Sequence, residues 1–162
     1  MLKPLLTIII ISFTGTSFSS ETSNTIIDYK IDIKYNGVNE ELEITLQNKS
    51  SNILKIKEDA APFSLLVRGI NFSGFEETKA LKRVPLYYPI GSNPNFIEIP
   101  PQGSVTRNIE IKYFMKDHCK ITKENSVLIF WSYSARAGTN GEDVMLPSDG
   151  VFRIDKHKKS CD

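Results

Sequence analysis

Apolar and polar residues alternate with a period of two along most of the chain after residue 25. In TIIDYKIDIKYNG, every second residue from Ile27 to Tyr35 is apolar, and the residues between them are aspartates and lysines. This pattern is typical of a β-strand that buries one face and exposes the other to water. Asn36-Gly37 predicts a two-residue hairpin turn, after which VNEELEITLQN resumes the alternation. The first two elements are therefore expected to pair as an antiparallel hairpin.

Further short strands are predicted along the rest of the chain. They are ILKIK, FSLLVRGINFSG (two short strands around Arg68-Gly69), NFIEI, VTRNIEIKYF, SVLIFWSYSA and VFRID. Trp131 shares a period-two face with Ile129 and Tyr133, and this face is expected in the core. Residues 136–150 are predicted to form a long polar loop, and helical periodicity is absent except for one turn expected near residues 76–82. The chain is therefore predicted to be all-β, a single antiparallel immunoglobulin-like β-sandwich of about seven to nine strands.

The N-terminus, MLKPLLTIIIISFTGTSFSS, has the three parts of an export signal. Lys3 provides the positive start, an apolar run follows, and Ser17-Phe18-Ser19 gives the small-x-small pattern of a cleavage site. The apolar run is shorter than the roughly 20 residues that cross a membrane as a helix. We therefore expect a cleaved signal peptide over residues 1–19, one β-sandwich domain over residues 20–162, and a periplasmic or extracellular location. No membrane span is expected in the mature chain.

The net charge and the spacing of the basic residues limit which classes of partner are expected. Removal of Lys3 with the signal leaves 19 basic residues against 19 acidic ones, so the mature chain is formally neutral. The only dense basic stretch is the short KHKKS near the C-terminus. Because binding to nucleic acid or to anionic membranes relies on clustered Lys and Arg, neither is expected as a partner.

Both cysteines and both histidines fall in two short stretches. Cys119 follows His118 in MKDHCKITK, and Cys161 follows His157 in DKHKKSCD. If the last two predicted strands pair antiparallel, both stretches emerge at the same end of the sandwich. In an oxidising compartment this placement predicts a Cys119–Cys161 disulfide. A Cys2His2 zinc site formed by all four residues is the alternative, and two free thiols are a third outcome.

The sequence carries no recognisable catalytic motif. It lacks the G-x-S-x-G nucleophile elbow, the H-E-x-x-H zinc motif, a Gly-rich phosphate loop and an EF-hand pattern. The paired carboxylates along the chain are more simply solvated turns. We therefore expect no enzymatic activity and no cofactor. The alternative is a small enzyme or metal carrier that uses His118 and His157.

Two segments are candidates for binding another protein. The predicted loop between the last two strands carries Arg136, Asn140, Glu142 and Asp143, and loops at the end of a sandwich often carry binding residues. Oxygen ligands from Asn140, Glu142, Asp143 and Asp149 also raise the alternative of a calcium site. In VPLYYPIG, Tyr87 and Tyr88 lie between prolines, and tyrosines of this kind are enriched in interfaces. The alternative is that this stretch covers an edge of the sandwich.

An ordered series of turn and core residues resembles a known exported module. FSLLVRGINFSG resembles a V-x-x-x-G-x-x-V-x-Y-x-G hairpin, with Gly69, Ile70, Phe72 and Gly74 at matching places. FIEIPPQGSVTRNIEIKYF resembles F-x-x-L-x-P-G-E-S followed by an apolar strand, although Gln102 is inserted and the acidic residue is missing. VLIFWSY resembles the subsequent Y-x-V-x-W-x-Y. Together they are similar to the β-sandwich of deuterolysin-type metallopeptidase propeptides and related small stand-alone exported proteins, over about half of the mature chain.

The resemblance implies a module that covers, escorts or restrains an exported hydrolase, and no catalytic residue is carried over from it. A free-standing version would act as an inhibitor, or as an immunity protein that binds a delivered toxin. The expected function is therefore an exported, non-catalytic protein-binding domain whose partner is another protein. An accessory or adhesive structural module of the cell envelope is the alternative, because exposed strand edges also support assembly.

Overall fold

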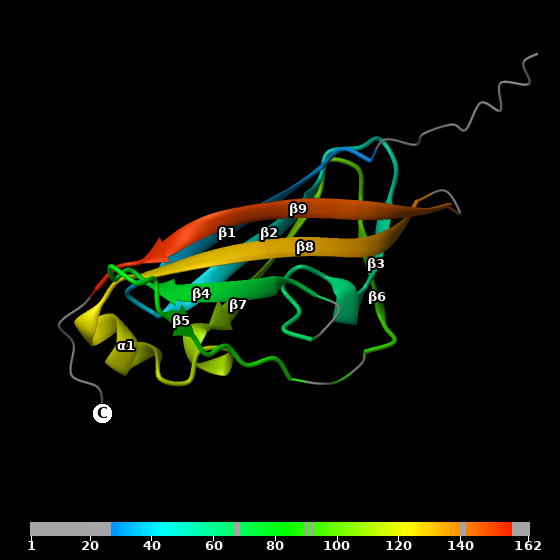
Figure 1. Ribbon diagram of the computed structural model, residues 1–162. Helices are drawn as coiled ribbons and strands as arrows, with labels where there is room; N and C mark the ends of the chain where they lie inside the picture. Colours follow the sequence, from blue (N-terminus) through cyan, green and yellow to red (C-terminus); the bar gives the residue numbers. More distant parts are fainter. Residues whose placement is uncertain (1–26, 67–68, 90, 92, 140–141, 157–162) are drawn as a thin grey trace, which may run out of the picture.

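Two antiparallel sheets build the fold in the computed structural model, which describes residues 27–66, 69–89, 91, 93–139 and 142–156 (Figure 1). The three-stranded sheet has the order β1-β2-β7, with β1 at Tyr29–Asn36, β2 at Glu41–Asn48 and β7 at Ser104–Glu110. The six-stranded sheet contains β3 (Leu54–Lys57), β4 (Asn71–Glu76), β5 (Arg83–Val84), β6 (Phe96–Ile99), β8 (Val127–Thr139) and β9 (Glu142–Ile154). The predicted all-β sandwich is confirmed.

The core forms where the inward faces of the two sheets meet. Leu42, Ile44 and Leu46 point inward from β2, and Ile129, Trp131 and Tyr133 do so from β8, as their period-two spacing predicts. Trp131 lies opposite Gly150 of β9, where a Cβ would come within 2.7 Å of the indole Nε1. The absence of a side chain at Gly150 therefore makes room for the indole ring.

The β1–β2 connection is longer than the sequence predicts. β1 ends at Asn36 and β2 begins at Glu41, so residues 37–40 form a four-residue loop instead of the two-residue turn expected at Asn36-Gly37. The Asn36 Oδ1 atom accepts hydrogen bonds from the backbone N–H groups of Val38 (3.0 Å) and Asn39 (3.4 Å). These bonds hold an Asx-type loop, and Glu40 closes it with a φ of 56°.

Four other local predictions are wrong. Most of residues 136–150, expected as a polar loop, extend β8 and β9 into a long hairpin. Residues 63–66 form no strand, and residues 111–113 form a 3-10 turn instead of continuing β7. The helix α1 (His118–Glu124) occupies a stretch where none was expected, and a second 3-10 turn covers Glu58–Ala60. No described helix is long and apolar enough to cross a membrane. The predicted signal peptide, residues 1–19, lies outside the described residues.

Candidate functional site

β3 and β4 behave as two halves of one interrupted strand. Both pair antiparallel with the same side of β8, β3 through residues 137–138 and β4 through residues 127–132. The chain leaves the sheet after Lys57 and returns at Asn71. Residues 133–135 of β8 consequently have no described strand beside them on this side, while β9 pairs with their other side. We call this stretch, bounded by Lys57 and Asn71, the β8 slot.

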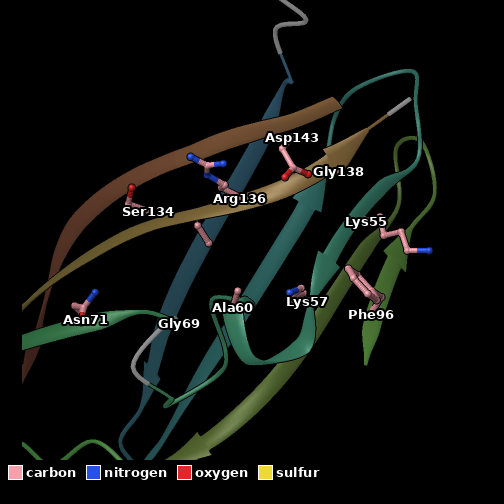
Figure 2. Close-up of a pocket in the computed structure, with 11 residues that line it drawn as sticks. Lys55, Lys57, Ala60, Gly69, Asn71, Phe96, Ser134, Arg136, Gly138 and Asp143 are labelled. Atoms are coloured by element: carbon pink, nitrogen blue, oxygen red, sulfur yellow. The ribbon is translucent and has the colours of Figure 1, made fainter. Parts of the chain in front are cut away.

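A cavity of about 580 Å³ lies at the β8 slot (Figure 2). Ala60, Gly69 and Ala135 line one wall of the cavity and contribute small side chains or none. Larger residues at these positions would fill the cavity. The other lining residues are Lys55, Lys57, Asn71, Phe96, Ser134, Arg136, Gly138 and Asp143. Taken together, the lining residues come from five strands, β3, β4, β6, β8 and β9, and from the segment between β3 and β4, which contributes Ala60 and Gly69.

The segment between β3 and β4 is held against the sheet beside this cavity. The hydroxyl of Tyr133 donates a hydrogen bond to the backbone oxygen of Ala60 at 2.7 Å. Burial raises the pKa of this hydroxyl, so it remains a donor throughout the accessible pH range. Backbone bonds from Ser64 N to Ala61 O (2.9 Å) and from Gly69 N to Leu66 O (2.8 Å) fold the segment on itself. The position of the cavity wall is therefore fixed by Tyr133.

The backbone of β8 points hydrogen-bonding groups into the β8 slot. Pro147 of β9 lies opposite Ser134, has no N–H, and its oxygen accepts a hydrogen bond from the hydroxyl of Tyr29. Ser134 and Pro147 are therefore a non-hydrogen-bonded pair, and the N–H and C=O of Ser134 face away from β9. Because strand backbones alternate, the N–H and C=O of Arg136 face the same way. Continuing the β3–β8 register places Lys57 opposite Arg136, so β3 already covers the backbone of Arg136. Ser134 has no described strand residue opposite it on this side, and it offers a donor and an acceptor to an incoming chain.

The β8 slot carries more positive than negative charge. Lys57 and Arg136 make no ion pair with any described residue, whereas Lys55 Nζ lies 2.9 Å from Glu98 Oε1 and 5.1 Å from the centre of the Phe96 ring. Asp143 is the one carboxylate that lines the cavity among the described residues, and it lies at the Gly138 end. Two cations that make no ion pair with a described residue therefore lie at the β3 end of the slot.

Apolar side chains are exposed on the same outer face of the six-stranded sheet. Phe130 is 48% exposed, Val151 opposite it 56%, Met145 47% and Phe96 51%. Phe75 packs edge-on against Phe130, with ring centres 5.9 Å apart. Exposed apolar side chains grouped on one face are typical of interaction surfaces.

The structure brings two of the predicted binding residues together at the β8 slot. Arg136 lies on β8 and Asp143 on β9, and both line the cavity (Figure 2). They are strand residues and not loop residues as the sequence predicted. Asn140 lies outside the described residues, as does the side chain of Glu142.

Tyr87 and Tyr88 lie elsewhere, near α1. The Tyr88 hydroxyl donates to the backbone oxygen of Phe72 at 2.5 Å, and burial raises its pKa. Tyr87 is 55% exposed, and Lys116 Nζ lies over its ring, 4.5 Å from the ring centre. Tyr88 therefore occupies the backbone oxygen of Phe72 in β4. The side chain of Tyr87 is exposed to a partner on a surface separate from the β8 slot.

The calcium site suggested by the sequence cannot use both of its described aspartates, while its other two ligands, Asn140 and the side chain of Glu142, lie outside the described residues. Asp143 and Asp149 lie six residues apart on the outer face of β9. At about 3.4 Å per residue, an extended strand separates them by roughly 20 Å. One ion cannot bind both carboxylates.

The histidine and cysteine predictions fall only partly within the described residues. His118 and Cys119 begin α1, while His157 and Cys161 lie outside the described residues. His118 Nε2 lies 2.8 Å from Glu40 Oε2, and its Nδ1 lies 3.2 Å from the backbone oxygen of Met115. His118 thus joins α1 to the β1–β2 loop. No group of three or more metal-ligating side chains occurs among the described residues.

The topology agrees with the premise of the predicted disulfide. Val127 at the start of β8 pairs with Ile154 near the end of β9, so the chain after β9 begins beside the chain that follows α1. Within the described part of the chain, no cysteine is a free thiol. The pairing of Cys119 with Cys161 itself remains a prediction.

Replacing Cys161 with serine should lower the free energy of unfolding by about 4 kcal/mol, because the disulfide would close a loop of some 40 residues. Urea unfolding of the variant and of the oxidised protein measures this difference. The double Cys119→Ser, Cys161→Ser variant should match the single variant. Two titratable thiols in the purified native protein would contradict the pairing.

Sequence reasoning missed Ser134, Lys57 and Phe96 as site residues. The available signal was a large apolar residue on the polar face of a strand, as at Phe96 beside Glu98. The gap between β3 and β4 left no sequence signal, because it depends on two distant segments pairing with one strand.

No protein-family model and no curated protein matches this chain. Among solved structures, a protein from Archaeoglobus fulgidus is similar to it, with a TM-score of 0.35 and 9% sequence identity. The match covers 80% of this chain and 96% of that one. A likeness at this level carries no argument about function.

Proposed function

We propose that this protein is an exported, non-catalytic protein-binding domain that contacts its partner with the outer face of the six-stranded sheet around the β8 slot. The observation that carries the proposal is the slot itself, where a stretch of β8 without a described strand beside it, two cations without an ion pair to any described residue, and exposed apolar side chains occur together. Proteins rarely leave strand backbone uncovered, because an open edge is a template for another chain.

The composition of this face suits a protein partner better than a small molecule. Phe130, Val151 and Met145 are spread along β8 and β9 outside the cavity. A small ligand inside the cavity would leave most of this apolar surface in water. A protein that covers both the slot and the apolar side chains would bury them together, and apolar burial contributes roughly 25 cal/mol per Å².

The class of partner follows from the resemblance described above. A module similar to deuterolysin-type propeptides would bind an exported hydrolase, as an inhibitor or as an immunity protein against a delivered toxin. The fold alone does not carry this step, because one fold serves many functions. The exported location rests on the predicted signal peptide over residues 1–19.

Native mass spectrometry of the mature protein, purified from the envelope of its own host, tests the proposal. We expect a complex with a second polypeptide. Lys57→Glu and Phe130→Ser should each weaken that complex at least tenfold, because one reverses a charge beside the slot and the other removes an exposed ring.

Lys30→Glu is the matched control. Lys30 is also an exposed strand lysine, but it lies on β1 in the three-stranded sheet. This variant should retain the complex. A bare monomer from the host envelope, or a complex that survives both slot-face variants, would overturn the proposed surface.

An accessory or structural module of the envelope is the second candidate, and the β9 edge favours it. Among the described strands β9 pairs only with β8, which leaves one long side open. Pro147 lacks an N–H, and Tyr29 occupies its oxygen, so a further strand could pair only with the parts of this edge on either side of Pro147. This candidate expects self-association that persists in Lys57→Glu.

A further inference from the structure

The β8 slot is closed at both ends. β3 ends beside one end of it and β4 begins beside the other, and both lie along the line that a new strand would follow against β8. A peptide that paired with Ser134 would meet the backbone of Lys57, opposite Arg136, in one direction and that of Asn71, opposite Ser132, in the other. Ser132 and Arg136 are four residues apart, which is roughly 13 Å of strand.

Only about three extended residues fit into this length, because each one advances the chain by roughly 3.4 Å. A long strand that continues in both directions is therefore excluded by geometry. A segment that enters from the outer face and ends in the slot meets no such obstacle. The closed ends thus favour a chain terminus over the middle of a strand.

The charges show which terminus fits. Lys57 and Arg136 have no anionic partner among the described residues, while Lys55 already pairs with Glu98. Asp143 lies at the far, Gly138 end of the cavity and would repel a carboxylate placed there. A carboxylate held between Lys57 and Arg136 is attracted by both cations, whereas an N-terminal ammonium would be repelled by them.

We propose that the β8 slot binds the last two or three residues of a partner polypeptide, with the terminal carboxylate between Lys57 and Arg136. The main chain of these residues pairs with the N–H and C=O groups of Ser134. A side chain directed inward faces the shallow wall of Ala60, Gly69 and Ala135. This inference rests on the proposed function and specifies the part of the partner that is recognised.

Amide chemical shifts measured by NMR provide the test. The probe is a pool of N-acetylated hexapeptides with randomised last three positions, prepared with a free carboxyl group and, in parallel, as C-terminal amides. We expect the free acids to shift the backbone amide signals of Ser134 and Arg136 saturably. The amides should bind at least tenfold more weakly, since they lack the terminal charge.

Variants locate the carboxylate. Lys57→Gln and Arg136→Gln should each weaken binding of the free acids about tenfold, and Lys30→Gln on the other sheet should not change it. Amides that bind as well as acids, or an amidated peptide with an internal glutamate that does so, would overturn recognition of a terminus. Shifts confined to other regions, or none, would also overturn it.

The outcomes separate this inference from the proposed function. If Lys57→Glu abolishes the native complex but the peptides leave the slot signals unchanged, the outer face binds a partner by other contacts, and only the terminal recognition fails. If the peptides bind as expected and no native complex depends on this face, the proposed function fails and the slot chemistry stands.

Discussion

Replacing Gly69 with alanine should lower the free energy of unfolding by about 3 kcal/mol, in the upper range for overpacking. A Cβ on Gly69 would lie 2.0 Å from the backbone oxygen of Ser64 and 3.0 Å from that of Ala61. Both neighbours are main chain, so neither can rotate away. Relief requires the segment between β3 and β4 to shift, and this segment forms one wall of the β8 slot. Urea unfolding followed by Trp131 fluorescence measures the loss.

Gly138→Ala is the matched control, because Gly138 lines the same cavity. Its added Cβ would meet the Lys55 backbone oxygen at 3.7 Å and Asp143 Oδ1 at 4.0 Å, which is ordinary contact. The stability should change by less than about 1 kcal/mol, in either direction. Equal losses for both variants would mean that the close approach at Gly69 does not hold the segment in place.

The Gly69 result would also give a physical reason for one position of the family resemblance. In FSLLVRGINFSG the resemblance places a glycine at Gly69, but the sequence alone suggests a turn between two strands. The structure shows a single strand after this point and a tight contact before it. The turn between two strands that the sequence predicts around Gly69 is therefore not the local structure found there.

Strands with large apolar residues at every second position were predictable from the sequence. Ile31, Ile44 and Ile129 are all buried as expected. The hairpin extension of β8 and β9 was missed for a chemical reason. Its inward residues include Ala135, Ala137 and Thr139, which give little apolar signal, while Met145 faces outward. The alternation was therefore too weak to be distinguished from a loop.

The helix α1 was missed because little in its sequence favours a helix. Its seven residues, HCKITKE, include two β-branched residues and no regular apolar stripe. Helices of this length depend on tertiary contacts, since nucleation is unfavourable in isolation. Here His118 bonds to Glu40 from a distant loop, a contact that sequence spacing does not reveal.

The candidate site was accessible in part. Arg136 and Asp143 were named from their charge and their place before the last strand, and both line the β8 slot. The slot itself required knowledge of long-range pairing, because β3 and β4 are separated from β8 by more than fifty residues. Sequence reasoning therefore identified some side chains of the site. It could not identify the stretch of β8 without a described strand beside it, next to which these side chains lie.

Asn48→Ala should destabilise the protein by about 3 kcal/mol, because Asn48 joins the two sheets at one corner. Its side chain is fully buried, and Nδ2 donates to the backbone oxygens of Asn52 (2.7 Å), Ile99 (3.0 Å) and Pro100 (3.1 Å). Its Oδ1 accepts from the Ser50 N–H at 3.0 Å and hydroxyl at 2.6 Å. Alanine would leave the buried oxygen of Ile99 without its donor and would also remove the four part-buried bonds, and an unsatisfied buried group alone costs about 1 kcal/mol or more.

Asn48→Asp should be at least as harmful as alanine, even though it preserves the shape of the side chain. An ionised aspartate has no hydrogen to donate and would face three carbonyl oxygens in a site without water access. Asn108 supplies the control, since its Nδ2 bonds to Glu41 Oε2 at 3.2 Å on an exposed face. Asn108→Ala should change the free energy of unfolding by less than about 0.5 kcal/mol. If Asn48→Asp unfolded at the same urea concentration as the native protein, the corner would have to be held by the Asn48 backbone bond to Gly103 and not by the amide side chain.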